Sequence, residues 1–240
     1  MGTAGSRRDR VRAATATKIK ETARKVLVAE GPDGLSLRAI ARDMGTTAPA
    51  LYRYFSSREK LLLALIADLY GELTEQLEAA RAQAGAAPPA LFAISREFRR
   101  WALANQREFG LLFGRPIPVT DGEESPGSTG HPAAERLSQV FGSLVAEIYL
   151  TSPFPIPSDA EIDPVLAAEL RTWCGRLPVE LPVELPVGAG QVSLSCWSRL
   201  YGMVAMEIFG HLRFALTDAE PMFEVELRDL AAKLGFVGQV

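Results

Sequence analysis

The side chains best suited to binding a polyanion gather in one short stretch of this chain, from Ser36 to Leu61. The stretch reads SLRAIARDMGTTAPALYRYFSSREKL and combines arginines, tyrosines and small hydroxyl residues. Arginine binds phosphates and base edges through its planar fork of N–H donors, and Tyr and Ser hydroxyls donate to phosphate oxygens. These residue types indicate nucleic-acid recognition, provided that the local elements hold them on one exposed surface.

A first short helix is predicted directly after Ser36. Apolar residues recur at i, i+3, i+4 and i+7 from Leu37 to Met44, so one face of the helix is apolar. Ser36 is a suitable N-cap, and Gly45 can end the helix in a left-handed conformation. A tight turn is therefore expected at Gly45.

A second short helix follows this turn. Either Thr46 or Thr47 can cap it, and Pro49 is tolerated in its first turn because that position needs no intrahelical N–H donor. Leu51 and Phe55, four residues apart, anchor this helix to the first, which leaves the intervening Tyr and Arg side chains exposed. Two short helices joined by a tight turn, with exposed Tyr and Arg, match the description of a helix-turn-helix.

The same residues resemble the DNA-binding domain of TetR/AcrR-type transcriptional regulators. The family often has Lys where this chain has Arg58, which preserves the charge. The matching positions are Ser36, Ile40-Ala41, Gly45, Thr46-Thr47, Leu51-Tyr52, Tyr54-Phe55, Arg58-Glu59 and Leu61-Leu62.

The predicted recognition surface consists of Thr47, Ala48, Pro49, Ala50 and Arg53, with Arg38 reaching in from the preceding helix. The resemblance implies phosphate contacts by Tyr52, Tyr54, Ser57 and Arg58. Ser36 and Thr46, at the helix starts, complete the predicted DNA-binding set.

Charge is distributed unevenly along the 240 residues. Residues 1–64 hold 13 Lys+Arg against 6 Asp+Glu, a net charge of +7, whereas residues 65–240 carry a net charge of −10. This asymmetry suits a polyanion bound at one end, although a solvated basic face is the alternative. We expect a flexible basic arm at 1–14, either inert or touching DNA, a DNA-binding domain at 15–60, and a ligand-binding and dimerisation domain at 61–240.

The fold class expected is all-α, because the chain contains no convincing strand pattern. Further apolar periodicity predicts helices at residues 15–30, 57–83, 88–105, 107–113, 132–150, 164–177, 191–214 and 218–234. Residues 116–131, rich in Gly, Pro and Ser, predict a loop. The tandem repeat LPVELPVELPV at 177–187 predicts an extended linker, with a ligand-contacting flap as the alternative.

The stretch from Trp197 to Gly202 resembles a Trp-x3-His-Gly signature of one TetR C-terminal subfamily, with Tyr201 in place of the usual His. The resemblance implies a homodimer whose last two long helices pair across a two-fold axis, so that two DNA-binding domains read a palindromic operator on double-stranded DNA. The residues predicted at the dimer interface are Trp197, Tyr201, Gly202, Met206 and Phe209.

The resemblance also implies a pocket for a small hydrophobic effector. Aromatic side chains fit a mostly apolar pocket, although each one alone also fits an ordinary core. The residues predicted to bind the ligand are Trp101, Phe109, Phe113, Phe141, Tyr149 and Trp173. The implied function is that of a ligand-responsive regulator, most simply a bacterial repressor released from DNA by a small apolar molecule.

The sequence gives little support to an enzyme. His131 and His211 are its two histidines, and neither has a nucleophile or a pair of metal ligands at catalytic spacing. We expect no catalytic residues, metal or cofactor. A small all-α enzyme and a DNA-binding protein without ligand control remain the alternatives.

The expected location is the bacterial cytoplasm. The Arg-rich beginning is not that of a signal peptide, and no apolar run approaches the ~20 residues of a membrane span. Cys174 and Cys196 read as buried free thiols in a reducing compartment. An Arg-to-Lys ratio of 21 to 5 is typical of a GC-rich bacterial genome.

Overall fold

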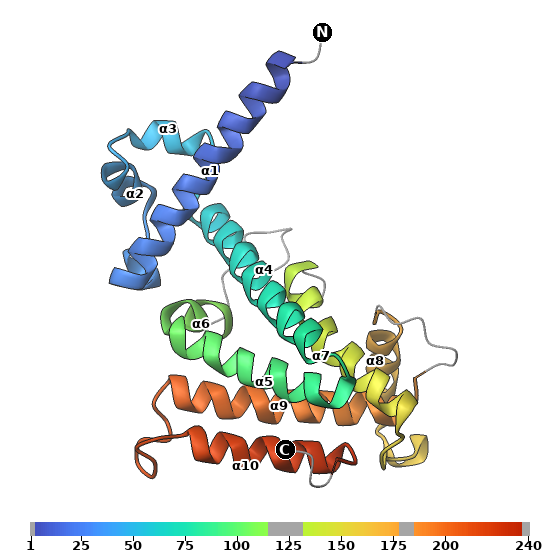
Figure 1. The fold of residues 1–240 in the computed structure, drawn as a ribbon. Helices are drawn as coiled ribbons and strands as arrows, with labels where there is room; N and C mark the ends of the chain where they lie inside the picture. The colour runs from blue at the N-terminus through green and yellow to red at the C-terminus, as the bar shows by residue number, and fades with distance from the viewer. Residues whose placement is uncertain (1–2, 115–131, 178–184, 237–240) are drawn as a thin grey trace. The chain divides into compact units, whose positions relative to one another are not determined.

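The computed structural model describes residues 3–114, 132–177 and 185–236, and these ranges form ten α-helices and two 3-10 turns without a strand (Figure 1). The all-α prediction is confirmed. The helices are α1 (Thr3–Glu30), α2 (Leu37–Asp43), α3 (Ala48–Tyr52), α4 (Arg58–Ala84), α5 (Ala87–Ala104), α6 (Gln106–Phe113), α7 (Pro132–Thr151), α8 (Pro164–Cys174), α9 (Val187–Ile208) and α10 (Glu220–Lys233). The 3-10 turns are η1 (Pro32–Gly34) and η2 (Asp159–Glu161).

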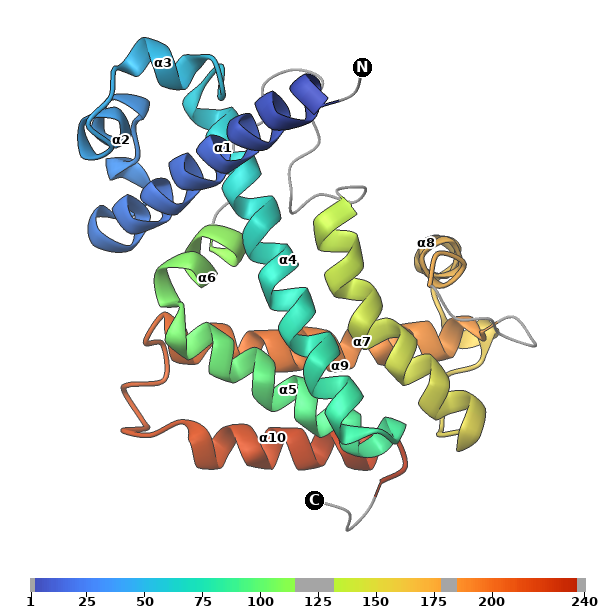
Figure 2. The ribbon, with the colours of Figure 1, turned by 45° about the horizontal axis from the view of Figure 1, so that its top comes forward.

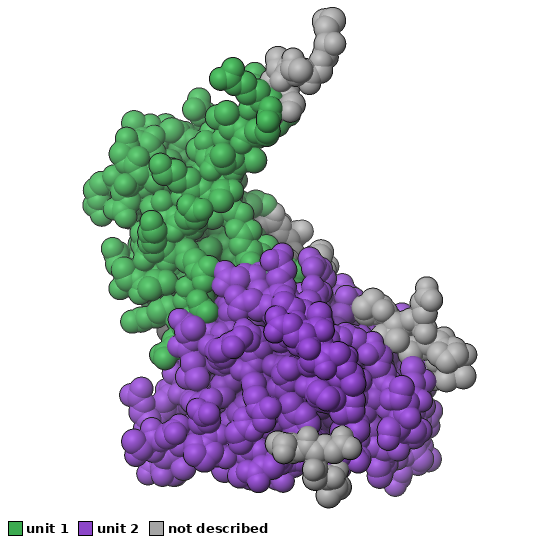
Figure 3. Space-filling model, in the orientation of Figure 1, with its two compact units in different colours: residues 1–71, 105–134 green, residues 72–104, 135–240 purple. Residues whose placement is uncertain are grey.

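The chain divides into two compact units (Figure 3). The first contains residues 1–71 and 105–134, and the second contains residues 72–104 and 135–240. Helix α4 therefore belongs to the first unit in its first half and to the second unit in the remainder. These units do not coincide with the predicted division at residue 60, which stays a prediction of how the chain divides by function.

Helix α1 is the scaffold of the first unit. Its apolar stripe of Ile19, Ala23 and Leu27 is fully buried, and α1 packs against α2 and α6. Burial of such a stripe is the main source of stability for a helix in a protein. Leu51 of α3, 2% exposed, is the predicted anchor of the second short helix and is confirmed as a core residue.

The beginning of α1 differs from the prediction. The helix starts at Thr3 rather than near Thr15, so its predicted start is wrong, whereas the flexibility of the predicted basic arm at 1–14 stays a prediction. Arginine and alanine, which are abundant there, are strong helix formers even without an apolar stripe. Once Ile19 and its neighbours pack, each residue added to the helix gains one further hydrogen bond.

The second unit is built around an aromatic core. Phe98 of α5, fully buried, meets Phe141 of α7 edge-on at 6.2 Å between ring centroids, and Trp197 of α9 lies 5.3 Å from Phe98 and 4.8 Å from Phe141. Edge-to-face and tilted pairs at such distances add to the stability gained by burying the rings. Helices α9 and α10 run antiparallel side by side, with α5 also packed on α9 (Figures 1 and 2).

Helix α9 is shifted toward the N-terminus relative to its predicted span of 191–214. It ends at Ile208 because Gly210, with φ of 73°, closes a Schellman motif in which His211 N–H donates to Met206 O at 2.8 Å. It begins at Val187 because glycines permit close packing there. A Cβ at Gly188 would lie 2.3 Å from the Pro157 carbonyl oxygen.

Two predicted segments fall outside the described residues. The loop prediction at 116–131 lies within residues 115–131, and most of the repeat at 177–187 lies within residues 178–184. The flanking Leu177 and Leu185 are described, and both are buried in one apolar cluster with Ala146, Cys174 and Ala189.

Candidate DNA-binding surface and assembly helices

The turn between α2 and α3 is fixed by local hydrogen bonds. The Ser36 hydroxyl accepts the Ala39 N–H at 3.1 Å and caps α2, as predicted. Gly45, with φ of 63°, closes a Schellman motif in which Thr46 N–H donates to Ala41 O at 2.9 Å. The chain thus reverses within a few residues, and α3 packs directly on α2.

Helix α3 and the residues at its two ends carry most of the predicted recognition set. Thr47 is its N-cap residue in an extended conformation, and Pro49 occupies the first turn. Ala48 and Ala50 are half-buried. The exposed members of the predicted set are Arg38, Thr46, Thr47, Pro49, Tyr52 and Arg53.

The predicted phosphate contacts after α3 also have roles inside the first unit. The Ser57 hydroxyl accepts the Lys60 N–H at 3.2 Å and caps α4. Arg58 donates from Nε to Leu35 O at 2.8 Å and from Nη2 to Pro32 O at 2.6 Å. Arg58 therefore ties the start of α4 to the loop before α2 and positions the helix-turn-helix. Tyr54, between the two helices, is half-buried.

Helix α6 is fastened to α1 by a polar cluster that the sequence did not reveal. Arg24 donates from Nε to Glu108 Oε1 at 2.9 Å and from Nη2 to Asn105 Oδ1 at 3.0 Å. The Glu108 residue is only 5% exposed, so Arg24 supplies hydrogen bonding that solvent water does not. The residues are more than 80 positions apart, and no periodic pattern links them.

The six predicted ligand-binding aromatics occupy several environments. Phe109 and Phe113, with ring centroids 4.8 Å apart, belong to the first unit, and the other four belong to the second. Trp101 donates its Nε1–H to Glu72 at 3.1 Å. Tyr149 packs edge-on against Phe154, and Trp173 packs on two apolar clusters.

A small apolar cavity of about 20 Å³ lies in the second unit, between α5, α7, α9 and α10. Phe141 is the predicted ligand residue that lines it, together with Trp197 and several leucines. The hydroxyl-bearing residues Ser95 and Ser193 and the thiol residue Cys196 add the polar lining. Burial raises the pKa of the Cys196 thiol. A cavity of this volume holds about one water molecule.

An apolar stripe is exposed along α9, α10 and the segment between them. Its members are 39% to 89% exposed, which is high for large apolar side chains. Of the predicted interface residues, Met206 and Phe209 belong to the stripe, and an added Cβ at Gly202 would meet no atom within 4 Å. Trp197, by contrast, turns into the aromatic core, and Tyr201 stacks on it at 6.1 Å. The exposed apolar residues are Leu194, Met206, Phe209, Phe214, Met222 and Val225.

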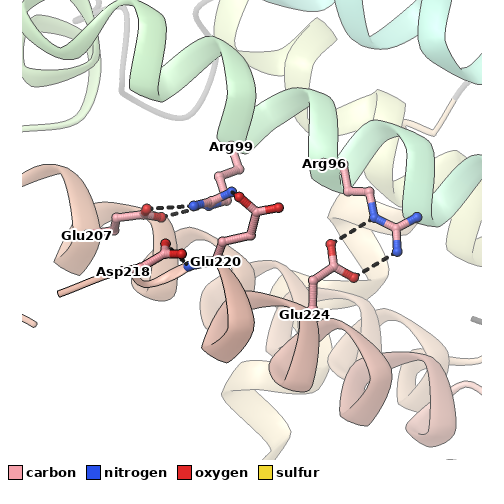
Figure 4. Close-up of polar contacts among 6 residues, drawn as sticks. All are labelled: Arg96, Arg99, Glu207, Asp218, Glu220 and Glu224. Carbon is pink, nitrogen blue, oxygen red and sulfur yellow. Dashed lines mark hydrogen bonds and ion pairs between the residues drawn. The ribbon is translucent and has the colours of Figure 1, made fainter. Parts of the chain in front are cut away.

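Paired arginines hold α9 and α10 against α5 (Figure 4). Arg99 donates two hydrogen bonds to the Glu207 carboxylate, both at 2.8 Å, and lies 3.5 Å from Glu220. Arg96 makes the same two-point contact with Glu224 at 2.9 and 2.8 Å. Bidentate pairs of this kind fix orientation as well as adding energy. The α9–α10 hairpin is therefore presented in a defined geometry.

Neighbouring groups reinforce this arrangement. The Asp218 carboxylate accepts the Glu220 N–H at 2.9 Å at the start of α10, and the Arg99 guanidinium stacks over the Phe223 ring at 5.2 Å. Side chains of Arg99 and Glu207 are each 13% exposed. Loss of Arg99 would remove the bidentate partner of a largely buried Glu207 carboxylate, whereas loss of Glu207 would leave Arg99 with Glu220.

The Arg96–Glu224 pair predicts an acid-sensitive contribution to stability. Hydrogen bonding from Arg96 lowers the pKa of Glu224 below its ordinary value of 4.5. Because the folded-state pKa is the lower one, the stabilisation is present above pH ~4.5 and is lost as pH falls through the folded value. In thermal melts at fixed protein concentration, the Tm difference between wild type and Glu224→Gln should be constant from pH 7 to 5 and shrink below that. The exposed Glu169→Gln serves as the control, and an equal trend in both variants would contradict the assignment.

These features define a class of protein. The first unit is basic and exposes Arg, Thr and Tyr from a helix-turn-helix. Helix α4 continues from it into an all-helical unit with an exposed apolar stripe. This combination is that of a helical DNA-binding protein.

The comparisons with known proteins give the family. Residues 19–65 match the family described as bacterial regulatory proteins of the tetR family, and residues 91–230 match the Tetracyclin repressor-like C-terminal domain. The chain belongs to the TetR family of transcriptional regulators. The narrower Trp-x3-His-Gly assignment stays a prediction.

Individual relatives agree with this. The HTH-type transcriptional regulator Rv1816 of Mycobacterium tuberculosis (strain ATCC 25618 / H37Rv) is 32% identical over 238 residues, covering 96% of each chain. The crystal structure of the protein SCO4313 aligns with a TM-score of 0.70 at 32% identity, over 92% of this chain and 97% of that one. A TetR/AcrR-family regulator from Thermobifida fusca YX-ER1 shares the fold, with a TM-score of 0.58 at 20% identity, over 91% of this chain and 97% of that one.

Helix length and apolar character also bear on membrane association. Within the described ranges, none combines the length and apolar character needed to cross a bilayer.

Proposed function

We propose that this TetR-family regulator is a dimeric repressor whose affinity for a palindromic operator is lowered by a small apolar molecule. The DNA-binding part of this proposal rests on the exposed surface of α2 and α3. Buried Ile19 of α1, buried Leu51 of α3 and the hydrogen bonds of Arg58 at the start of α4 stabilise the unit that contains this surface. A recognition surface must be rigid to read bases, and these contacts supply that rigidity.

On this proposal, α3 enters the major groove with Thr47, Pro49 and Arg53 facing the bases. Arg38 reaches in from α2, and the Tyr52 hydroxyl contacts a phosphate. A bidentate contact between Arg and guanine contributes about 1–3 kcal/mol of discrimination against the wrong base. Tyr54 is half-buried, and Ser57 and Arg58 make hydrogen bonds within the first unit. Their phosphate contacts would therefore be additional to a structural role.

The test begins with selection of preferred duplexes from a random-sequence pool by the wild-type protein. Affinity for the selected duplex relative to a scrambled one is then measured by anisotropy for Arg53→Ala, Arg38→Ala and a matched control, Arg42→Ala. Arg42 is also exposed on α2 but lies outside the predicted set. The first two variants should lower the preference about 5- to 150-fold, as that discrimination energy implies. An unchanged preference in Arg53→Ala would refute the assignment of α3 as the reading helix.

The dimer is proposed to form through the apolar stripe of α9 and α10. Met206, Phe209 and Met222 supply exposed apolar side chains of the types enriched at interfaces. Two copies related by a two-fold axis would carry two DNA-binding domains, which is the requirement for reading a palindrome. A stable dimer of this kind buries at least ~1,200 Å² in total.

Effector control is the finer part of the proposal. An apolar molecule that prefers a widened form of the cavity beside Phe141 would shift the protein toward that form. A coupling of about 1–3 kcal/mol would weaken DNA binding, and DNA would weaken ligand binding equally. Thermal-shift screening of apolar metabolites and antibiotics, followed by operator titration with and without each hit, tests both sides of this linkage.

A second candidate function is DNA binding without ligand control, with which the small volume of the cavity beside Phe141 agrees. About 20 Å³ is far below the ~300–1,000 Å³ typical of ligand pockets, so an effector there would have to push Leu200, Leu227 and Leu234 apart. DNA binding without ligand control requires no such opening. Ligands that stabilise the protein without changing operator affinity would favour this second candidate.

A further inference from the structure

Residues 7–14 of α1 are not packed into the core of the first unit. Every described side chain from residue 7 to residue 14 is exposed, and Val11 is 60% exposed. The buried stripe of α1 begins only at Ile19. In both ribbon views these first turns run on beyond α2 and α3 (Figures 1 and 2).

This exposed portion of the helix is strongly basic. Four arginines occupy positions 7, 8, 10 and 12, and Asp9 is the single acidic residue among the first 20 residues. Like charges spaced along an exposed helix repel one another, and a polyanion bound beside them relieves this repulsion. The composition therefore fits a partner that carries closely spaced negative charges.

The helical geometry of α1 determines the face on which these arginines lie. Arg8, Arg12 and Ile19 are spaced by four and seven residues, so they lie along one face of the helix. Ile19 is fully buried, which means that this face is the one by which α1 packs on the rest of the first unit. Arg8 and Arg12 thus lie on the same face of α1 as its buried stripe, before the point where packing begins.

Resting on the proposed function, we infer that residues 7–12 of α1 form a second DNA contact, in which the arginines bind backbone phosphates beside the half-site that α3 reads. An α-helix is about 10–12 Å wide and does not fit a minor groove about 6 Å wide. The helix therefore lies along the phosphate ridge, where arginines add affinity without reading sequence.

Salt dependence is the measurement that separates this contact from a solvated basic face. Each neutralised phosphate contributes about 0.9 to the slope of log affinity against log salt, so four arginines contribute up to about 3.6 per subunit. In Arg7→Ala/Arg8→Ala/Arg10→Ala/Arg12→Ala, the slope should fall by at least about 2 per subunit. The fall should be equal on the selected duplex and on a scrambled duplex, so the preference between them is unchanged.

Matched variants make the result specific. Replacing the same four arginines with lysine keeps the charge and should restore the slope to within about 1 of wild type. The double variant Arg8→Ala/Arg12→Ala is compared with Arg136→Ala/Arg171→Ala, which removes two exposed arginines from the second unit. Far-UV circular dichroism checks that helicity is retained, as alanine's high helix propensity predicts.

The outcomes distinguish this inference from the proposed function. If wild type prefers a selected duplex and the four-alanine variant keeps the wild-type slope, residues 7–12 make no DNA contact and the inference fails alone. A changed preference between duplexes would mean that the arginines read bases, which overturns the phosphate assignment. A wild-type protein that binds no duplex would remove the proposed function and this inference together.

Discussion

Replacing Met206 with glutamate is expected to convert the protein from dimers to monomers and to weaken operator binding by at least ~100-fold. Met206 is 42% exposed on the protomer and lies between Gly202 and Phe209 on the apolar stripe. A carboxylate at the centre of an apolar interface has to be desolvated without a partner, and like charges meet across the two-fold axis. Operator affinity falls when dimerisation is lost, because the second DNA-binding domain is then no longer tethered to the first.

Val165→Glu is the matched control for this change. Val165, on α8 in the same unit, is 70% exposed, so the substitution introduces the same charge at another exposed apolar position. Sedimentation velocity should show dimers for wild type and Val165→Glu but monomers for Met206→Glu. Gly202→Glu should behave like Met206→Glu, since the protomer leaves open space around Gly202. Intact dimers in both stripe variants would place the interface elsewhere.

The local architecture of the helix-turn-helix was predictable because short-range interactions determine it. Ser36 caps α2 and Gly45 adopts a left-handed conformation, and each of these features depends on residues within one turn of the chain. Leu51 was predictable as an anchor because its spacing places it on the apolar face. Such signals need no knowledge of the distant parts of the fold.

Contacts between distant segments could not be predicted in the same way. Arg24 and Glu108 are 84 residues apart, and nothing in either local pattern assigns one to the other. Arg58 matched a family phosphate contact, yet its guanidinium also bonds to the Pro32 and Leu35 carbonyls. A basic side chain has the same sequence signature whether it meets a phosphate or a backbone oxygen.

The aromatic residues show a related difficulty. Helical spacing predicts that Trp101, Phe109 and Phe141 face inward, and all three are buried. It does not say which of them meet, because that depends on how helices from different parts of the chain cross. Phe109 belongs to the first unit and Phe141 to the second, whereas Trp197, predicted at the dimer interface, joins the core beside Phe141.

Truncating Phe98 to alanine is expected to lower the free energy of unfolding by about 3–5 kcal/mol. Phe98 is fully buried and contacts the rings of Phe141 and Trp197, so its removal loses burial and leaves a cavity. Phe98→Leu should lose less, because leucine fills part of the space. The measurement is urea unfolding at one fixed protein concentration, because stability of a dimer depends on concentration.

The same variant tests whether this aromatic cluster serves packing or ligand access. Phe141 and Trp197 also line the small cavity, so the space left by Phe98→Ala lies next to it. An apolar cavity of this kind stays dry and binds a small aromatic molecule such as benzene. Benzene should therefore raise the Tm of Phe98→Ala more than that of wild type. As a surface control, Val165→Ala should change the free energy of unfolding by less than ~0.5 kcal/mol. A loss below ~1 kcal/mol in Phe98→Ala would show that the cluster is loosely packed and already open to a ligand.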